Sequence, residues 1–316
     1  GVYIKAISAL PPAVMATETA VPVFIGYTEK DKKKGVSLVN NPVGISSLIE
    51  FEAIFGIAKP HPVIVSLNSN QQPAAGITVG PLQFSLYYSL RLYFANGGGA
   101  CFIISCGTWP PEVTEEESFT AQTLALQAAA REKTITIIVL PDAGLCGKEN
   151  FYRLYQSALQ QAGTLQNRIV IADIFLEDKT CAFSAIGEEF RKMIGNDHLS
   201  FGAAYYPYLQ TSILPFIDEA KETVMIGEDI YRLRLPDHSP AEELKRSLAH
   251  VNPALYHSIQ TVKQKNPVIL PPASAMACIY CLVDADRCVW KAPANISLNM
   301  VAKPMGLIDY QEQQEM

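Results

Sequence analysis

The hydrophobic pattern of the chain centres on an apolar stretch at residues 82–96, which predicts a buried helix. Apolar residues face nearly every direction around such a helix, whereas a surface helix shows a single apolar stripe. Gly97, Gly98 and Gly99 follow, and glycine ends helices because it readily adopts left-handed backbone conformations. The uninterrupted apolar run at residues 100–105 then predicts a short strand buried on both faces. We therefore expect this helix and strand at the centre of a domain.

Apolar runs alternate with amphipathic segments along most of the chain. The pattern predicts strands at residues 21–27, 36–38, 100–105, 135–140, 169–174 and 200–206, with a hairpin at 224–226 and 231–235. It predicts helices at residues 47–55, 112–131, 149–162, 185–194, 241–265 with a break at Pro253, and 273–284. Strands that alternate with helices predict an α/β fold, with a mostly parallel sheet flanked by helices and right-handed crossovers.

Capping residues place the ends of two of these helices. Ser46 or Ser47 can cap the helix that ends at Gly56, with Glu50 completing a capping box. Ser239 can cap the helix that begins near residue 241, because a hydroxyl followed by proline is a common helix start.

The composition points to a protein whose surface is covered by partners. Of 316 residues, 49% are hydrophobic and 18% are charged, which is below the usual quarter or so. The length fits two domains or one large one. A net charge of −6 speaks against nucleic acid as a partner. The basic cluster at residues 30–34 is interpreted as a solvated loop tip.

Compartment signals are few. Seven cysteines spread over a long chain fit no disulfide framework and indicate a reducing compartment during folding. The sequence shows no signal peptide and no apolar run long enough to span a bilayer, so no membrane partner is expected. Because the chain opens on Gly1, we expect that its start has been trimmed.

Two glycine-rich segments suggest phosphate loops, and both are rejected. The run at residues 97–99 lies after a helix and before a strand, which is the reverse of the order in phosphate loops. The segment from Gly144 through Gly147 and Lys148 has the correct order, but Glu149 replaces the residue that would hold magnesium. We expect no cofactor at either loop.

The cysteines near the end of the chain resemble part of a zinc site. Cys278, Cys281 and Cys288 supply three thiols, but structural zinc needs four ligands, so buried thiols within a helix are the better interpretation. His250 and His257 have no third ligand nearby in the sequence. No metal site is predicted.

Two sets of triad residue types were considered for catalysis. Asp237, His238 and Ser239 are adjacent on a loop, whereas catalytic triads converge from separate segments. Asp173, His198 and Ser274 occur in the chain order of subtilisin, but no nucleophile motif surrounds the serine. We therefore expect no catalytic residues.

The N-terminal segment can form a short strand that has no neighbour in sequence. Pro11 and Pro12 separate it from the rest of the chain, so it must pair with a sheet elsewhere. It can dock on its own domain, or it can add to the sheet of a neighbouring subunit. The residues of this strand are Val2, Tyr3, Ile4, Lys5, Ala6 and Ile7.

Several segments together resemble one protein family. GVYIKAISALPPAV and VPVFIGYT near the start, NPVGISSLIEFEAIFG, the helix running into NGGGACFI, and VWKAPAN at residues 289–295 resemble the tail sheath proteins of contractile phages and injection systems. The resemblance covers residues 1–309, and the C-terminal domain of the family does not follow. AREKTITIIVLPDAG, RIVIADIF and LSFGAAYYPYL resemble the central domain of the family, which is described as subtilisin-like.

The resemblance implies a domain division and a function. It implies a linking arm (residues 1–20), an N-terminal α/β portion (21–107), a central sheath domain (108–288) and a connector (289–316). It implies a non-enzymatic subunit that forms stacked hexameric rings around an inner tube and contracts by rearrangement. The implied partners are other sheath subunits, the tube protein, and baseplate and terminator or cap proteins. Assembly would occur in the bacterial cytoplasm.

Two alternatives remain open at this point. The chain can be an α/β hydrolase or a nucleotide-binding enzyme, with Asp142 and Asp173 at the carboxyl ends of strands. A pocket that holds one of these carboxylates beside a histidine or lysine would favour that alternative. The other possibility is an adhesion or baseplate module without an exchanged arm.

Overall fold

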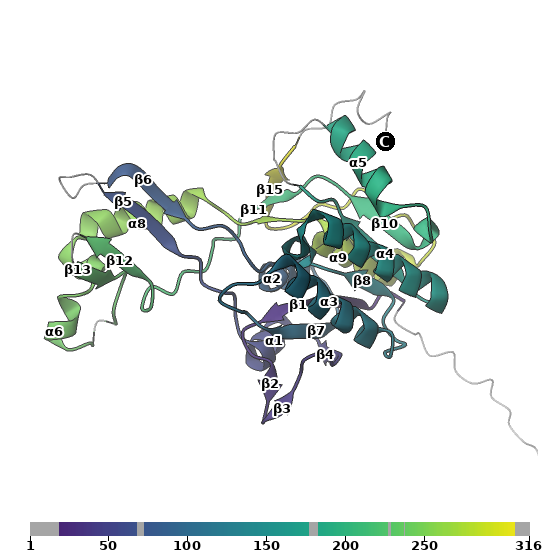
Figure 1. Cartoon of the computed structure of the whole chain (residues 1–316), viewed down its shortest axis with the longest axis horizontal. Coiled ribbons are helices and arrows are strands. Elements are labelled where there is room, and N and C mark those ends of the chain that lie inside the picture. Colours follow the sequence, from purple (N-terminus) through teal and green to yellow (C-terminus); the bar gives the residue numbers. More distant parts are fainter. Residues whose placement is uncertain (1–18, 68–72, 177–182, 227–228, 237, 307–316) are drawn as a thin grey trace, which may run out of the picture.

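The structure consists of a larger α/β body and a smaller lobe, which lie side by side (Figure 1). The lobe is built from two separate stretches of the chain, residues 63–79 and 223–265, so the chain leaves the body twice and returns twice. The computed structural model describes residues 19–67, 73–176, 183–226, 229–236 and 238–306.

A six-stranded sheet forms the centre of the body within these described residues. Its strand order is β10-β9-β8-β1-β7-β4, and β4 at one edge runs antiparallel to β7 while the other pairs are parallel. The mostly parallel sheet predicted from the sequence is therefore confirmed. The strands are β1 (Pro22–Thr28), β4 (Val43–Ile45), β7 (Cys101–Thr108), β8 (Ile137–Val139), β9 (Ile169–Asp173) and β10 (Gly202–Tyr205).

The central strand β1 is buried along its whole length because helices cover both faces of the sheet. Val23 and Ile25 belong to the core on one face, whereas Phe24 belongs to the core on the other. This alternation follows the period of two in a strand. The continuous apolar run in the sequence is thus explained by burial on both faces.

Helices cover the two faces of the sheet in two layers (Figure 1). One layer contains α1 (Leu48–Phe55), α2 (Leu86–Ala95) and α9 (Ala273–Arg287). The other contains α3 (Glu115–Ala129), α4 (Gly147–Leu165) and α5 (Phe183–Ile194). Short 3-10 helices occur at Ala143–Cys146 and Leu199–Phe201.

Helix α2 is apolar all round because it lies between two cores. Leu86, Leu90 and Tyr93 pack with the central sheet, whereas Tyr88 and Leu92 pack into a separate core with a small second sheet. The buried helix predicted from the pattern is confirmed, although it begins at residue 86. The small sheet consists of β11 (Leu209–Thr211), β14 (Ile269–Leu270) and β15 (Val301–Pro304).

The structure confirms the predicted ends of α1 but not the predicted surroundings of the strand at residues 36–38. The Ser47 side chain accepts a hydrogen bond from the Glu50 N–H at 3.2 Å, and Gly56 ends the helix at a φ of 87°, as predicted. The strand predicted at residues 36–38 forms, but it does not join the central sheet, because β7 and β8 occupy both sides of β1. The residues concerned form a separate hairpin of β2 (Lys32–Lys33) and β3 (Val36–Ser37).

The lobe has a core of its own. The predicted hairpin is confirmed as β12 (Thr223–Ile226) and β13 (Asp229–Arg232), which lies beside β5 (Val63–Leu67) and β6 (Pro73–Val79). The predicted break at Pro253 is confirmed, because α8 (Pro253–Lys265) begins there and ends at Lys265, whereas the part before it is divided into α6 (Ala241–Leu244) and α7 (Leu248–Val251). The expected cap by Ser239 was wrong, because Pro240 occupies the N-cap position of α6 and no side chain caps the helix. The core includes Val63, Val224, Leu233, Leu248 and Ile259.

The sheet draws strands from both sides of the predicted boundary between residues 107 and 108. Strands β1, β4 and β7 precede it, and β8, β9 and β10 follow it. The predicted connector supplies β15, which pairs with β11 in the body. The domain division stays a prediction. Among the described residues, no helix has the length and apolar character that crossing a membrane requires.

Candidate functional site

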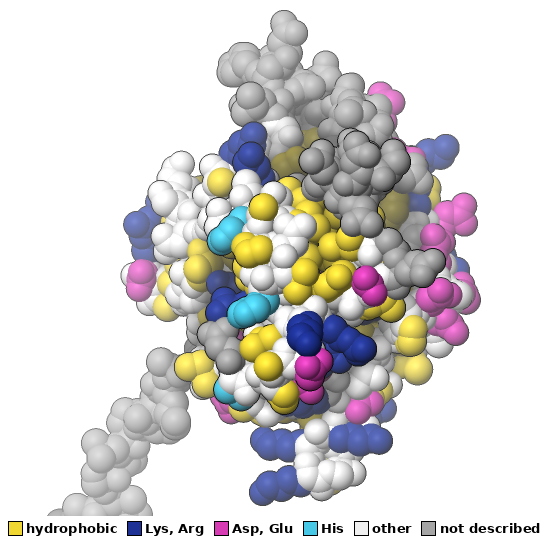
Figure 2. Space-filling model, turned by 90° about the vertical axis from the view of Figure 1, so that its left-hand side faces the viewer, with side chains coloured by type: hydrophobic (Ala, Val, Ile, Leu, Met, Phe, Trp, Pro, Cys, Tyr) yellow, Lys and Arg dark blue, Asp and Glu magenta, His cyan; other side chains and the backbone are white. Residues whose placement is uncertain are grey.

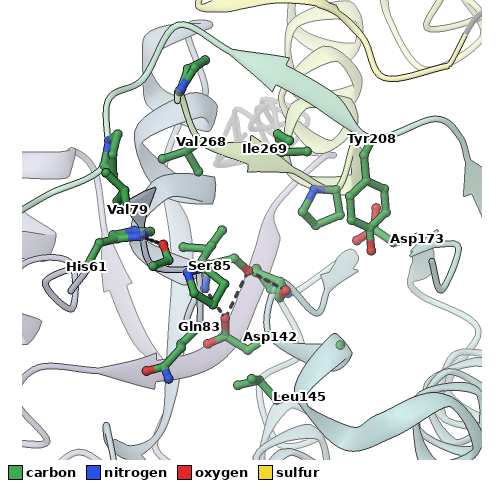
Figure 3. Close-up of a pocket in the computed structure, with 18 of the residues that line it drawn as sticks. His61, Val79, Gln83, Ser85, Asp142, Leu145, Asp173, Tyr208, Val268 and Ile269 are labelled. Carbon is green, nitrogen blue, oxygen red and sulfur yellow. Dashed lines mark hydrogen bonds between the residues drawn. The ribbon is translucent and has the colours of Figure 1, made fainter. Parts of the chain in front are cut away.

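One candidate for a chemical site is a pocket of about 490 Å³ at the carboxyl ends of β8 and β9 (Figure 3). It lies where the lobe joins the body, and such junctions and strand ends are common ligand positions in α/β proteins. Asp142 and Asp173 line it together with His61. The pocket thus contains the residue types that the enzyme alternative required, so the contacts of each side chain decide what it can do.

The Asp142 carboxylate anchors the start of α2. Its Oδ1 accepts hydrogen bonds from the N–H groups of Ser85 at 2.6 Å and Leu86 at 3.2 Å, and from the Ser85 hydroxyl at 3.1 Å. Its Oδ2 accepts the N–H of Tyr27, at the end of β1, at 2.8 Å. Burial raises the pKa of Asp142 to about 6, although these hydrogen bonds oppose the shift. The carboxylate therefore serves as a helix cap supplied by a distant strand.

The Asp173 carboxylate plays the same part for α9. Its Oδ1 accepts the N–H of Ala273 at 2.8 Å, and it is also hydrogen-bonded to the Tyr155 hydroxyl. Burial raises the pKa of Asp173 to about 7. In Figure 3 it lies beside Tyr208, on the far side of the pocket from His61. Two helix N-termini that could have held an anionic ligand are thus occupied by side chains of the chain itself.

His61 lies in the segment that connects α1 of the body to β5 of the lobe. Its Nδ1 donates to the Gly80 carbonyl at 3.0 Å, its backbone N–H donates to the Phe216 carbonyl, and its ring packs edge-on against Tyr88. Burial lowers its pKa, which favours the neutral ring. No local pattern marks this histidine as a pocket residue beyond its position between Pro60 and Pro62.

These contacts do not assemble an acid, a base and a nucleophile. The hydrogen bonds of both carboxylates fix main-chain or core groups, and the labelled side chains in Figure 3 do not converge on one point. General acid–base catalysis needs groups within hydrogen-bond reach of a common reacting atom. The pocket is therefore better explained as a junction in the fold than as a reaction site.

The imagined subtilisin-like triad is not brought together. Ser274 is buried in the first turn of α9 beside Ala273, and its hydroxyl has no hydrogen-bond partner among the described residues. His198 lines a different pocket and packs against Gly163. Of the adjacent set, His238 and Ser239 are described, and Asp237 lies outside the described residues.

The predicted thiols and loops occupy structural positions. Cys278 donates to the Asn96 carbonyl, Cys281 donates to the Ala20 carbonyl, and Cys288 is exposed. Burial raises the pKa of Cys278 to about 12. Lys148 forms a salt bridge with Glu189 on α5. His250 and His257 lie on different helices. Within the described part of the chain, no group of three or more histidine, cysteine or acidic residues could hold a metal.

The predicted inter-subunit strand is not tested by the geometry. Val2, Tyr3, Ile4, Lys5, Ala6 and Ile7 lie outside the described residues. The described surface does carry exposed apolar side chains, which Figure 2 shows as patches on the side of the lobe. Trp290, in the VWKAPAN segment, is 81% exposed, and Val289 beside it is 60% exposed.

Comparison with solved structures places this fold among known ones. The chain is similar to a chain in the cryo-EM structure of the anti-feeding prophage helical sheath in its contracted state, with 20% identity and a TM-score of 0.52. The match covers 100% of this chain. The chain has a sheath-like fold. No protein-family model matches the chain, and no curated protein matches it either.

Two further structures share the sheath-like fold. One is the baseplate of the anti-feeding prophage in its contracted state, with 21% identity, 97% of this chain covered and a TM-score of 0.57. The other is the sheath complex of an extracellular contractile injection system named PVC, with 19% identity, 100% covered and a TM-score of 0.52. The chain spans 58–61% of the length of these solved chains.

Proposed function

We propose that the chain is a structural subunit of the contractile sheath of a phage tail-like injection particle. The observation that carries this proposal is the match of 97–100% of the chain to chains of contractile sheath and baseplate assemblies. The contacts within the pocket support it, because the buried carboxylates hold helices in place and leave no assembled catalytic group. We therefore also propose that the chain is not an enzyme.

The proposed mechanism is a mechanical switch. Six subunits form a ring, stacked rings surround an inner tube, and subunits move to a packing of lower free energy when the particle contracts. Interfaces with two discrete packings can store and release free energy without a nucleotide. The α/β body, with helices on both faces of its sheet, provides a rigid unit for such movement.

The remaining parts of the proposal concern organisation and partners. We infer a linking arm at residues 1–20, α/β portions at 21–107 and 108–288 with a subtilisin-like arrangement, and a connector at 289–316. The partners are further sheath subunits, the inner tube, the baseplate, and a terminator or cap protein. The particle assembles in the bacterial cytoplasm.

Electron microscopy tests the proposal. The complete protein is produced together with its inner-tube protein and imaged by negative stain. We expect hollow, striated cylinders around the tube, and treatment that triggers contraction should shorten and widen them. A monodisperse protein that ignores the tube, or a cylinder formed by the tube protein alone, would refute the proposal.

A further inference from the structure

The β2–β3 hairpin is a small, basic projection from the body. Its strands pair Lys32 with Ser37 and Lys33 with Val36. Lys34 and Gly35 form the turn with φ values of 50° and 82°, the geometry of tight hairpins. A Cβ atom added at Gly35 would meet no other atom within 4 Å, so the tip stands in open space.

The base of the hairpin is fixed to the body. The N–H of Lys30 donates to the carbonyl of Phe55 in α1 at 2.9 Å, and the N–H of Leu38 donates to the carbonyl of Asp31 at 2.7 Å. Leu38 is buried in the core. Binding of a partner to the hairpin therefore requires little further ordering of the chain, which lowers the entropic cost of the contact.

The hairpin concentrates positive charge in an acidic chain. Lys30, Lys32, Lys33 and Lys34 are exposed and, within the described residues, take part in no salt bridge. Four lysines and Asp31 give residues 30–34 a charge of +3. The whole chain carries −6, so the other residues carry −9. A second copy thus carries an excess of acidic residues outside its own hairpin.

Exposed apolar side chains lie on the same part of the molecule. Val36 on β3 is 65% exposed, and Ile49 on α1, the helix beside the hairpin, is 78% exposed. Lys33 also helps to lower the pKa of Glu50 on α1, after the stronger effect of hydrogen bonds from Ser46. Apolar groups with charged residues around them are typical of protein interfaces.

We propose that the β2–β3 hairpin and the exposed face of α1 bind an acidic surface of a second copy of this chain. The contact is heterologous, since a basic prong meets a different surface of the next subunit, and such contacts generate rings or filaments. This inference rests on the proposed sheath function. It assigns an electrostatic contact in the body, separate from any contact made by residues 1–20.

Nucleic acid and membranes are poorer partners for this surface. Nucleic acid and an anionic membrane are extended polyanions, and tight binding to either requires many basic contacts, whereas the hairpin supplies four lysines. At moderate salt, the negative charge of the rest of the chain is screened beyond about 10 Å. A polyanion that binds the hairpin comes closer than this to the body and is therefore repelled by that charge. An acidic protein surface matched in size to the hairpin avoids this repulsion.

Self-association of the chain tests the inference. Sedimentation velocity of the wild type and of Lys32→Glu/Lys33→Glu is compared over a concentration series in about 50 mM and about 500 mM salt. We expect the wild type to associate in low salt and the variant to associate roughly tenfold more weakly, because both ion pairs become repulsive. Circular dichroism shows whether the fold is retained.

A matched control separates local from global charge. Lys245→Glu/Lys265→Glu changes the net charge equally on the lobe, and both lysines are exposed. We expect it to associate like the wild type. A photo-reactive residue at position 36 should crosslink to an acidic peptide of a second copy. Equal weakening by both variants, no association of the wild type, or crosslinks only to nucleic acid or lipid would overturn the inference.

Cylinder formation distinguishes a failure of the hairpin contact from a failure of the sheath proposal. If the complete wild-type protein forms cylinders on its tube and Lys32→Glu/Lys33→Glu forms them equally well, the hairpin contact is refuted and the sheath function stands. If the wild type forms none, the sheath function itself is refuted.

Discussion

The carboxylate of Asp173 accepts a hydrogen bond at 2.8 Å from the backbone N–H of Ala273, 100 positions further along the chain. Asp142 holds the start of α2 in the same way through Ser85 and Leu86. The ends of two neighbouring strands thus fix the starts of two helices that pack on one face of the sheet. These buried carboxylates maintain the arrangement of the body.

Replacement of Asp173 should weaken the fold. Asp173→Ala removes the acceptor for the Ala273 N–H and leaves buried donors unpaired, each at a cost of about 1–3 kcal/mol. We expect the free energy of unfolding to fall by roughly 2–4 kcal/mol, measured by urea denaturation. Asp173→Asn keeps one acceptor oxygen and should lose less. Equal stability of wild type and Asp173→Ala would contradict the anchoring role.

The stability of the protein should depend on pH through Asp142. Burial raises its pKa to about 6 from the ordinary 3.8, so the folded protein retains a proton that the unfolded chain releases. The free energy of unfolding should therefore rise as pH falls through 6 towards 4, and fall as pH rises. Between about pH 7.5 and about pH 5, the wild type should gain about 1 kcal/mol relative to Asp142→Asn.

Urea denaturation of both proteins at the two pH values measures this difference. Because every other titratable group is shared, its contribution largely cancels in the comparison. Parallel changes in the two proteins would show that Asp142 titrates alike in the folded and unfolded states.

Gly26 should be essential for the position of Asp142. A Cβ atom at Gly26 would lie 2.5 Å from the Asp142 Oδ2 and 3.1 Å from the Leu86 Cβ, so the carboxylate or α2 would have to move. We expect Gly26→Ala to lower the melting temperature strongly, with a loss of roughly 1–3 kcal/mol. Gly44→Ala on β4 is the control, because its Cβ would make only an ordinary contact, at 3.7 Å with Phe102. Similar losses in both variants would disprove this packing argument.

The N-terminal arm should link subunits in the complete protein. Tyr3→Pro or Ile4→Pro removes a donor from the strand and restricts the backbone, so a strand added to a neighbouring sheet should be lost. Electron microscopy should then show no cylinders. Tyr3→Ala and Ile4→Val keep the backbone donors and should assemble. Cylinders of normal length from the proline variants would argue against an exchanged strand.

Local patterns in the sequence predicted most elements of the body. The apolar run at β1, the all-round apolar α2, the glycine run before β7 and the capping residues of α1 each encode their structure within a few residues. The incorrect predictions concern features that depend on contacts with segments distant in the sequence. The β2–β3 hairpin does not extend the sheet, because β7 and β8, distant in sequence, already pair with β1.

The candidate site could be predicted only in part. Asp142 and Asp173 were recognised as carboxylates at strand ends, but not as caps of α2 and α9. Their partners lie 57 and 100 positions away, and no spacing rule connects them. His61 lines the same pocket because of how the segment between the body and the lobe folds, and no local sequence pattern predicts that fold.

By itself, the sequence determined most strands and helices of the body and the burial of the sheet on both faces, because hydrophobic period and capping act over a few residues. The tertiary structure alone decided strand order, the separation of the lobe, and the pairing of each buried carboxylate with a helix start. Those features depend on contacts between distant segments, where burial and hydrogen bonding are settled only once the whole chain has packed.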